Sequence, residues 1–265
     1  MLLNSVVIVL REALEAALLM SVLLACARFL NLGNRWIWLA IALGLVGAVS
    51  YGFFLEPVSE LFDGVGQEIC NALLQLTAFI LLVILAFRIP DRAARPDHNR
   101  TVIATLMTFT VALAITGEGA EILVYVSGFW SVNSLFSAVA IGSLIGACIG
   151  LSVGILIYYL LLGLAPKRLL PIAVMLLVLI AAGMSSQAVR LLIQADWVTS
   201  AGALWDTSGI LSEETLVGQL LYALIGYEAT PSAVEFIAYV GSIAVVSAAF
   251  IAGLINARRY TDYMK

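Results

Sequence analysis

The sequence predicts an all-α integral membrane protein with seven transmembrane helices, and its composition is the first reason. Of the 265 residues, 63% are hydrophobic and 11% are charged, and the mean hydropathy is +1.08. Soluble domains are typically about 45–50% apolar and about 25% charged, so a soluble enzyme and a disordered chain are both excluded. The net charge of −4 argues against a nucleic-acid partner, which requires a basic surface. The lipid bilayer is therefore the expected surroundings of this chain.

The lengths of the apolar segments are the second reason. A helix needs about 20 apolar residues to cross the hydrocarbon core. Seven segments meet or approach this length, so we expect a single transmembrane domain over residues 1–265. The first segment is not expected to be a cleaved signal peptide, because Arg11 and Glu12 interrupt its apolar run. The predicted spans cover residues 2–30, 36–55, 69–87, 102–127, 136–164, 169–194 and 238–257.

The distribution of charge between the links is the third reason, and it predicts the orientation. The links after the first, third and fifth spans, together with the C-terminal tail, hold 11 of the 13 basic residues. Cytoplasmic segments carry such an excess, so the N-terminus is expected outside and the C-terminus inside. The opposite links hold 10 of the 17 acidic residues. These acids either keep the outer loops soluble or form an electrostatic funnel for cations.

The outer link over about 195–237 is too long for a plain connection. Ser212 is expected to cap a short helix whose first turn holds Glu213 and Glu214, where acids favour the helix dipole. The apolar stretch over 216–225 then ends at Gly226. A short helix on the outer face is the prediction.

Small residues in the fifth span predict close helix packing. Gly142, Gly146, Gly150 and Gly154 recur every four residues and so share one helix face. Such a face lets a neighbouring backbone approach closely in a membrane.

Four glutamates lie within spans, where each ionised group costs about 2.5–3.5 kcal/mol even on insertion scales. The first span contains REALE from Arg11 to Glu15, and the fourth contains GEGAE from Gly117 to Glu121. Residues three apart are neighbours on a helix, so each E-x-x-E pair offers two carboxylates on one side. Both motifs lie about 10 residues, or roughly 15 Å, below the outer surface. Glu12, Glu15, Glu118 and Glu121 are therefore expected to form one site near the bilayer midplane.

The two motifs also occupy corresponding places in two blocks of three spans. A repeat with an odd number of spans is inverted in the membrane, a common transporter design. We therefore predict an inverted 3+3 repeat followed by a seventh helix. Gly117 and Gly119 flank Glu118 and are expected to loosen that helix and expose backbone carbonyls.

Four carboxylates suit hard cations such as calcium, magnesium, manganese or iron. The only histidine is His98 and no thiol lies beside the motifs, which disfavours copper and zinc. Arg11 is expected to pair with Glu15, and a buried ion pair or a proton relay without metal is the alternative to a cation site. Gln75, Gln187 and Arg190 either line the path or serve structure: the glutamines by bonding across helices, Arg190 by snorkelling to the outer interface.

The two motifs, with the outer segment over 204–232, resemble the oxidase-dependent high-affinity iron permease family, which has bacterial EfeU-type and fungal members. The resemblance implies a seven-span, N-out permease that carries iron as its transported substrate and has no permanently bound cofactor. It implies an oxidase or an iron-binding protein outside the membrane as partner. Gly117 stands where the second family motif usually begins with arginine. The site residues that the resemblance implies are Glu12, Glu15, Glu118 and Glu121 as iron ligands and Arg11 as their support.

The expected function is a high-affinity iron permease of the inner membrane, moving ferric iron delivered by its partner. Glu213 and Glu214 are candidate ligands at the entrance. A transporter of another divalent cation, such as manganese or lead, is the first alternative. The second is a membrane di-iron carboxylate oxidoreductase, although the bundle form of that site uses E-x-x-H ligands that this chain lacks. The oligomeric state is left open.

Overall fold

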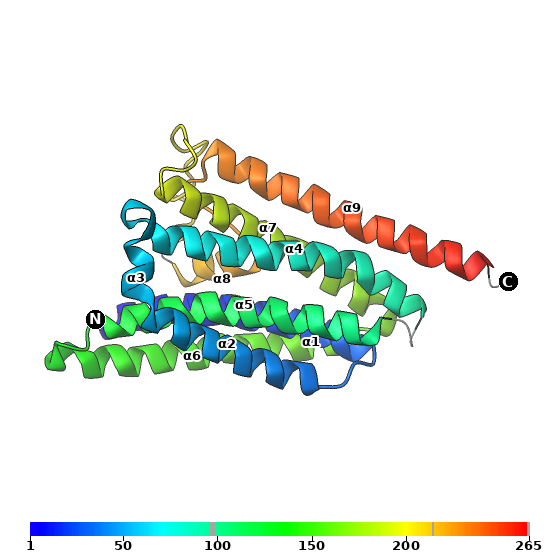
Figure 1. The fold of residues 1–265 in the computed structure, drawn as a ribbon, viewed down its shortest axis with the longest axis horizontal. Helices are drawn as coiled ribbons and strands as arrows, with labels where there is room; N and C mark the ends of the chain where they lie inside the picture. Colours follow the sequence, from blue (N-terminus) through cyan, green and yellow to red (C-terminus); the bar gives the residue numbers. More distant parts are fainter. Residues whose placement is uncertain (96–98, 214, 264–265) are drawn as a thin grey trace.

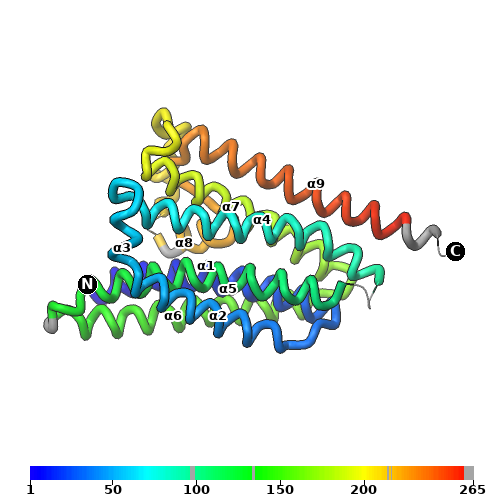
Figure 2. The backbone as a smooth tube through the Cα atoms, viewed as in Figure 1, coloured from blue at the N-terminus to red at the C-terminus, as the bar shows by residue number. Residues whose placement is uncertain are grey.

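A computed structural model describes residues 1–95, 99–213 and 215–263 and shows an all-helical chain (Figure 1, Figure 2). Within these ranges the only β pairing is the isolated bridge between Ala203 and Ser232. The prediction of an all-α protein is thus confirmed. The helices are α1 (Leu2–Phe29), α2 (Arg35–Phe53), α3 (Leu55–Ser59), the 3₁₀ helix η1 (Leu61–Gly64), α4 (Gly66–Ala94), α5 (Arg100–Ser127), α6 (Asn133–Leu162), α7 (Pro166–Gln194), α8 (Leu216–Ile225) and α9 (Ala233–Tyr263).

Six of the described helices are long and apolar enough to cross a membrane, so the chain is a multi-pass membrane protein. They are α2, α4, α5, α6, α7 and α9. Helix α1 is equally long, with 28 residues, but Arg11, Glu12 and Glu15 interrupt its apolar surface.

Several helices extend beyond the apolar segments seen in the sequence. Helix α4 continues through Pro90 to Ala94, about two turns past the expected end of its span. The difference arises because the predicted spans were ended at the last apolar residue, whereas the backbone hydrogen bonds of the helix continue into the polar residues that follow. The short helices α3 and η1, between α2 and α4, were not predicted because they are too short to show a periodic pattern.

The long helices alternate in direction, which gives the bundle two distinct ends (Figure 1). We call one the basic end; it holds the links between α1 and α2, α4 and α5, and α6 and α7, together with the C-terminus. The other, the acidic end, holds the N-terminus, α3 and the segment between α7 and α9. The basic and acidic links of the sequence are thereby gathered at opposite ends of the molecule.

Two helix pairs make the most extensive contacts: α1 lies along α6, and α2 lies along α5. The glycines of α6 make the first pair possible. A Cβ on Gly142, Gly146 or Gly150 would lie within 3.0 Å of α1 backbone atoms, and one on Gly154 would lie 2.7 Å from the Ala17 Cβ. The predicted close packing of this glycine face is confirmed.

The main apolar core fills the half of the bundle towards the basic end. Leu23 of α1, Leu85 of α4 and Met107 of α5 are fully buried in it, and α7 contributes Leu177. Side chains therefore pack tightly between the glutamate motifs and the basic end.

Helix α8 begins later than the sequence suggested. Its cap is Thr215, whose hydroxyl oxygen accepts a hydrogen bond from the Gly218 N–H at 3.1 Å. The expected cap at Ser212 is therefore wrong, and Glu213 lies in the turn before the helix. Glu214 lies outside the described residues.

Candidate metal centre

Three of the four motif glutamates converge where α1 and α5 pack together. One carboxylate oxygen from each of Glu12, Glu118 and Glu121 lies within 4.8 Å of the other two. Glu12 is 4% exposed and Glu118 is 8% exposed, so both are buried within the helix bundle, whereas Glu121 is half-buried. We call these three residues the carboxylate cluster. It joins both E-x-x-E motifs, which are more than 100 residues apart in the chain.

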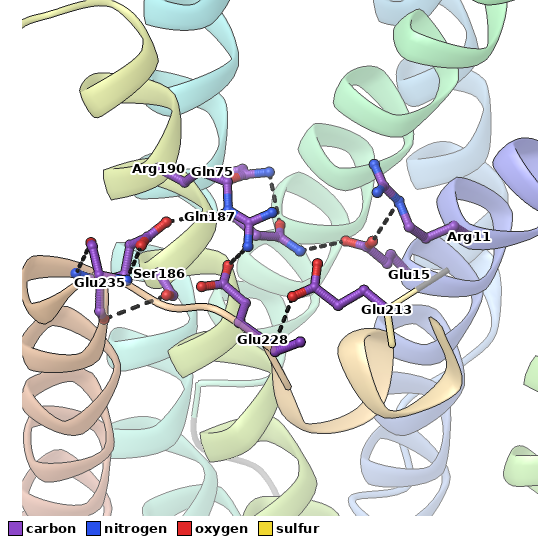
Figure 3. A network of polar contacts seen from close by, with 11 residues as sticks. Arg11, Glu15, Gln75, Ser186, Gln187, Arg190, Glu213, Glu228 and Glu235 are labelled. Atoms are coloured by element: carbon purple, nitrogen blue, oxygen red, sulfur yellow. Dashed lines mark hydrogen bonds and ion pairs between the residues drawn. The ribbon is translucent and has the colours of Figure 1, made fainter. Parts of the chain in front are cut away.

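Glu15 is not a member of the cluster. Its Oε2 accepts a hydrogen bond from the Gln187 Nε2 of α7 at 2.9 Å (Figure 3). Three residues along a helix correspond to a rise of about 4.5 Å, which sets Glu15 closer to the basic end than Glu12. Four glutamates were expected in one group, and the structure brings three of them together.

Arg11 pairs more closely with its neighbour Glu12 than with Glu15. The distance from its guanidinium to the Glu12 Oε1 is 2.8 Å, whereas its Nε lies 3.9 Å from the Glu15 Oε1. The guanidinium also lies over the Tyr222 ring, 5.5 Å from the ring centre. Arg11 therefore supports the cluster from the side of α8.

Amide side chains from the third and sixth predicted spans hold the second glutamate of each motif. The Asn71 Nδ2 donates to the Glu121 Oε1 at 3.0 Å, and Gln187 donates to Glu15. Gln75 in turn donates to the Gln187 Oε1 at 2.9 Å. The two glutamines thus bond across helices and also face the site. Asn71 was not among the predicted site residues, although its spacing of four residues from Gln75 places both on one face of α4.

A cavity of about 260 Å³ lies against the cluster. Its walls include the predicted Gln75 and Gln187, and at the C-terminal end of α7 it reaches Arg190, Leu191 and Gln194, towards the acidic end. The residues that line it are Arg11, Glu12, Glu15, Gln75, Glu118, Glu121, Gln187, Arg190, Leu191, Gln194 and Tyr222.

Arg190 lines the cavity and has two acidic partners. Its guanidinium forms ion pairs with Glu228 and, at 3.2 Å, with Glu235 (Figure 3). It also lies 5.7 Å from the centre of the Tyr222 ring. Burial raises the pKa of Glu228 to about 7, against the opposite effect of Arg190. Arg190 thereby ties the segment after α8 to the wall of the cavity.

Glu213 has a structural partner in the same segment. Its carboxylate accepts a hydrogen bond from the Ala229 N–H at 2.5 Å (Figure 3), and Glu213 is absent from the cavity wall. The candidate entrance ligand Glu213 is therefore held by a backbone hydrogen bond and is not one of the residues that line the cavity.

The glycines around Glu118 do not loosen their helix. Helix α5 is continuous from Arg100 to Ser127, so the expected exposure of backbone carbonyls is wrong. A Cβ at Gly119 would lie 2.9 Å from the Ala48 Cβ, which shows that this glycine serves the packing of α5 on α2. A Cβ at Gly117 would meet nothing within 4 Å.

Three carboxylate oxygens at this spacing can bind one hard cation, because such ions prefer oxygen ligands. The buried position strengthens the preference, since ionised carboxylates inside a membrane protein are costly without a positive partner. The Arg11 guanidinium supplies one positive charge to three acids.

Comparisons with known proteins point to one family. The model of the iron permease FTR1 family matches residues 2–260. The ferrous iron permease EfeU of Escherichia coli O157:H7 and that of Shigella sonnei are each 26% identical over 247 residues, covering 86% of this chain and 87% of the relative. The protein of the same name from Yersinia pestis is 24% identical over 254 residues, covering 88% and 87%. No solved structure matches.

Proposed function

Because the chain belongs to the iron permease FTR1 family, we propose that it carries iron across the bacterial inner membrane by way of the carboxylate cluster. The protein is a membrane transporter rather than an enzyme, which sets the oxidoreductase alternative aside. The observation that carries the proposal is the convergence of Glu12, Glu118 and Glu121 beside a cavity within the helix bundle. Structural ion pairing alone accounts for it poorly, because one arginine faces three acids, two of them buried.

We propose ferrous iron as the cargo. The cluster has a formal charge of −3 when ionised, and Arg11 brings the group to −2, the charge that a ferrous ion neutralises. The relatives named above are also ferrous iron permeases. Ferric iron supplied by an oxidase, as the motif resemblance implied, is the alternative. With ferrous cargo, an iron-binding protein outside the membrane would deliver the ion at the acidic end, whereas an oxidase partner belongs to the ferric alternative.

The proposed topology has seven spans, with α1 as the additional one and the acidic end outside. Helix α1 runs along α6 over its length, which supports a spanning role despite its three charges. The basic end is the cytoplasmic side by the excess of arginine and lysine in its links. The pairing of α1 with α6 and of α2 with α5 is what an inverted repeat of three spans would produce.

Uptake of radioactive iron into proteoliposomes tests this function. Wild-type protein is expected to take up ⁵⁵Fe²⁺ kept reduced by ascorbate, and Glu12→Gln and Glu118→Gln are each expected to lower the rate at least tenfold. Glu60→Gln, at an exposed position in the outer link, is the matched control and should keep the wild-type rate. Normal uptake by both cluster variants would refute the site.

The same assay decides the cargo. Ferric citrate replaces ferrous iron in a parallel series, and unlabelled manganese or lead is added as competitor. Preferential uptake of ferric iron, or complete competition by manganese or lead at equal concentration, would assign the cargo differently.

A further inference from the structure

The four motif glutamates divide into two successive groups along the bundle. We infer that they form two cation positions: an outer one at Glu12, Glu118 and Glu121, and an inner one between Glu118 and Glu15. The inference rests on the proposed function and adds a second binding position to it. A hard cation would pass from the first group to the second, with Glu118 as the ligand common to both.

Separation along the helices is the first reason. Helix α1 runs from the acidic end to the basic end, so Glu15 lies deeper than Glu12. Helix α5 runs the opposite way, so Glu121 lies nearer the acidic end than Glu118 (Figure 1). Glu12 and Glu118 are thus flanked by Glu121 on one side and by Glu15 on the other.

A second, smaller cavity is the next reason. It has a volume of about 20 Å³ and is lined by Glu15, Glu118 and Gln187, whereas neither Glu12 nor Glu121 reaches it. A volume of about 10–15 Å³ is enough to hold one water molecule, so this cavity suits a single dehydrated ion. Its remaining walls are mainly apolar side chains, among them Leu19 and Ile180.

Glu118 supplies an independent sign that a cation binds here. Its side chain lines both cavities, as do those of Glu15 and Gln187, and it is 8% exposed. Among the described residues no lysine or arginine forms an ion pair with it, since Arg11 pairs with Glu12 and Glu15. A buried carboxylate that faces two cavities without a basic partner is the group that an incoming cation would satisfy.

The amide hydrogen bonds give the two positions matching construction. Asn71 of α4 holds Glu121, and Gln187 of α7 holds Glu15. In each case the amide comes from the third helix of the opposite three-span block. Glu15 at the inner position and Glu121 at the outer position are therefore each held by an amide side chain. Gln187 acts as the positioning residue for Glu15.

The inner position is also the last polar place before the apolar core. Leu19 and Ile180, which line the small cavity, belong to the core cluster that fills the half of the bundle towards the basic end. A cation bound between Glu118 and Glu15 would thus lie next to the packed apolar core that separates it from the basic end. Glu15 is expected to matter for onward movement more than for first capture.

Equilibrium binding and transport separate the two roles. Purified full-length protein in detergent is titrated with ⁵⁵Fe²⁺ under anaerobic conditions, and the same preparations are assayed for uptake in proteoliposomes. Glu121→Gln is expected to weaken binding at least tenfold and to lower uptake equally. Glu15→Gln is expected to keep the binding constant within about threefold while uptake falls at least tenfold. Gln187→Ala should show the pattern of Glu15→Gln in milder form.

Each outcome has a distinct meaning. Equal loss of binding in Glu15→Gln and Glu121→Gln would overturn the inference and indicate one four-glutamate site, with the proposed function intact. Normal uptake by Glu15→Gln would overturn it as well. Absence of iron binding and uptake by the wild type would instead refute the proposed function. If Glu15→Gln fails to fold, Glu15→Asp, which keeps the charge but shortens the reach, is expected to retain binding and lose uptake.

Discussion

The glycine face of α6 gives the sharpest test of how the cluster is held, through the substitution Gly146→Ala. An added Cβ would overlap the Val6 carbonyl oxygen of α1 and lie 2.9 Å from the Leu10 backbone nitrogen. Both atoms belong to the backbone of a regular helix and cannot rotate away. Helix α6 must therefore move outward, away from the helix that carries Glu12 and Glu15.

The expected cost follows from this geometry. A gap of 0.5–1 Å between packed surfaces forfeits about a quarter to a half of the contact energy, and one extra methyl group in a packed interior typically costs about 1–3 kcal/mol. Gly241→Ala is the matched control, because a Cβ at this position of α9 would meet nothing within 4 Å. Both variants gain the same helix propensity, about 0.8–1.0 kcal/mol, so their difference isolates the packing cost.

Thermal unfolding of the purified variants in detergent measures that difference. About 2–4 °C per kcal/mol is usual for chains near this size, so Gly146→Ala should melt about 2–12 °C below Gly241→Ala. Iron uptake should fall in Gly146→Ala and stay normal in Gly241→Ala, since only the first displaces α1. Equal melting temperatures in the two variants would refute the described packing of α6 on α1.

Three further predictions concern single side chains. Gly117→Arg should fold, because its Cβ has free space, and should weaken ferrous iron binding about tenfold or more by bringing a second positive charge to the cluster; Gly117→Met is the neutral control in the same titration. Asn71→Leu removes the donor to Glu121, and loss of a hydrogen bond to a charged group, about 1.5–3 kcal/mol, should lower iron affinity at least tenfold. The pKa of Glu228, raised from 4.5 to about 7, means that the folded state holds this proton more tightly than the unfolded chain. Stability should therefore fall as the pH rises from about 4.5 to about 7, and Glu228→Gln should reduce that slope in unfolding scans between pH 4 and pH 8; an unchanged slope would contradict the assignment.

Motif spacing predicted part of the site and tertiary packing changed the rest. The convergence of Glu12 with Glu118 follows from equal depth in two spans, which a sequence reveals. The exclusion of Glu15 does not, because it depends on which partner α7 presents, and Gln187 lies 172 residues away in the chain. The ion pairs of Arg190 could not be predicted either, because Glu228 comes from the segment after α8 and Glu235 from the first turn of α9.

The amino-acid sequence by itself determined that this protein is embedded in the lipid bilayer and which segments are helical. It also determined which few charged residues lie within the apolar segments. These properties depend on local composition and periodicity, because each helix must satisfy its own backbone hydrogen bonds in a bilayer. Only the tertiary structure decided which helices pack together, and so which carboxylates share an oxygen cluster and which are held by amides. Those contacts depend on side chains that are far apart in sequence, such as Asn71 and Glu121, and their distances are fixed by the way α1, α4, α5 and α7 pack against one another.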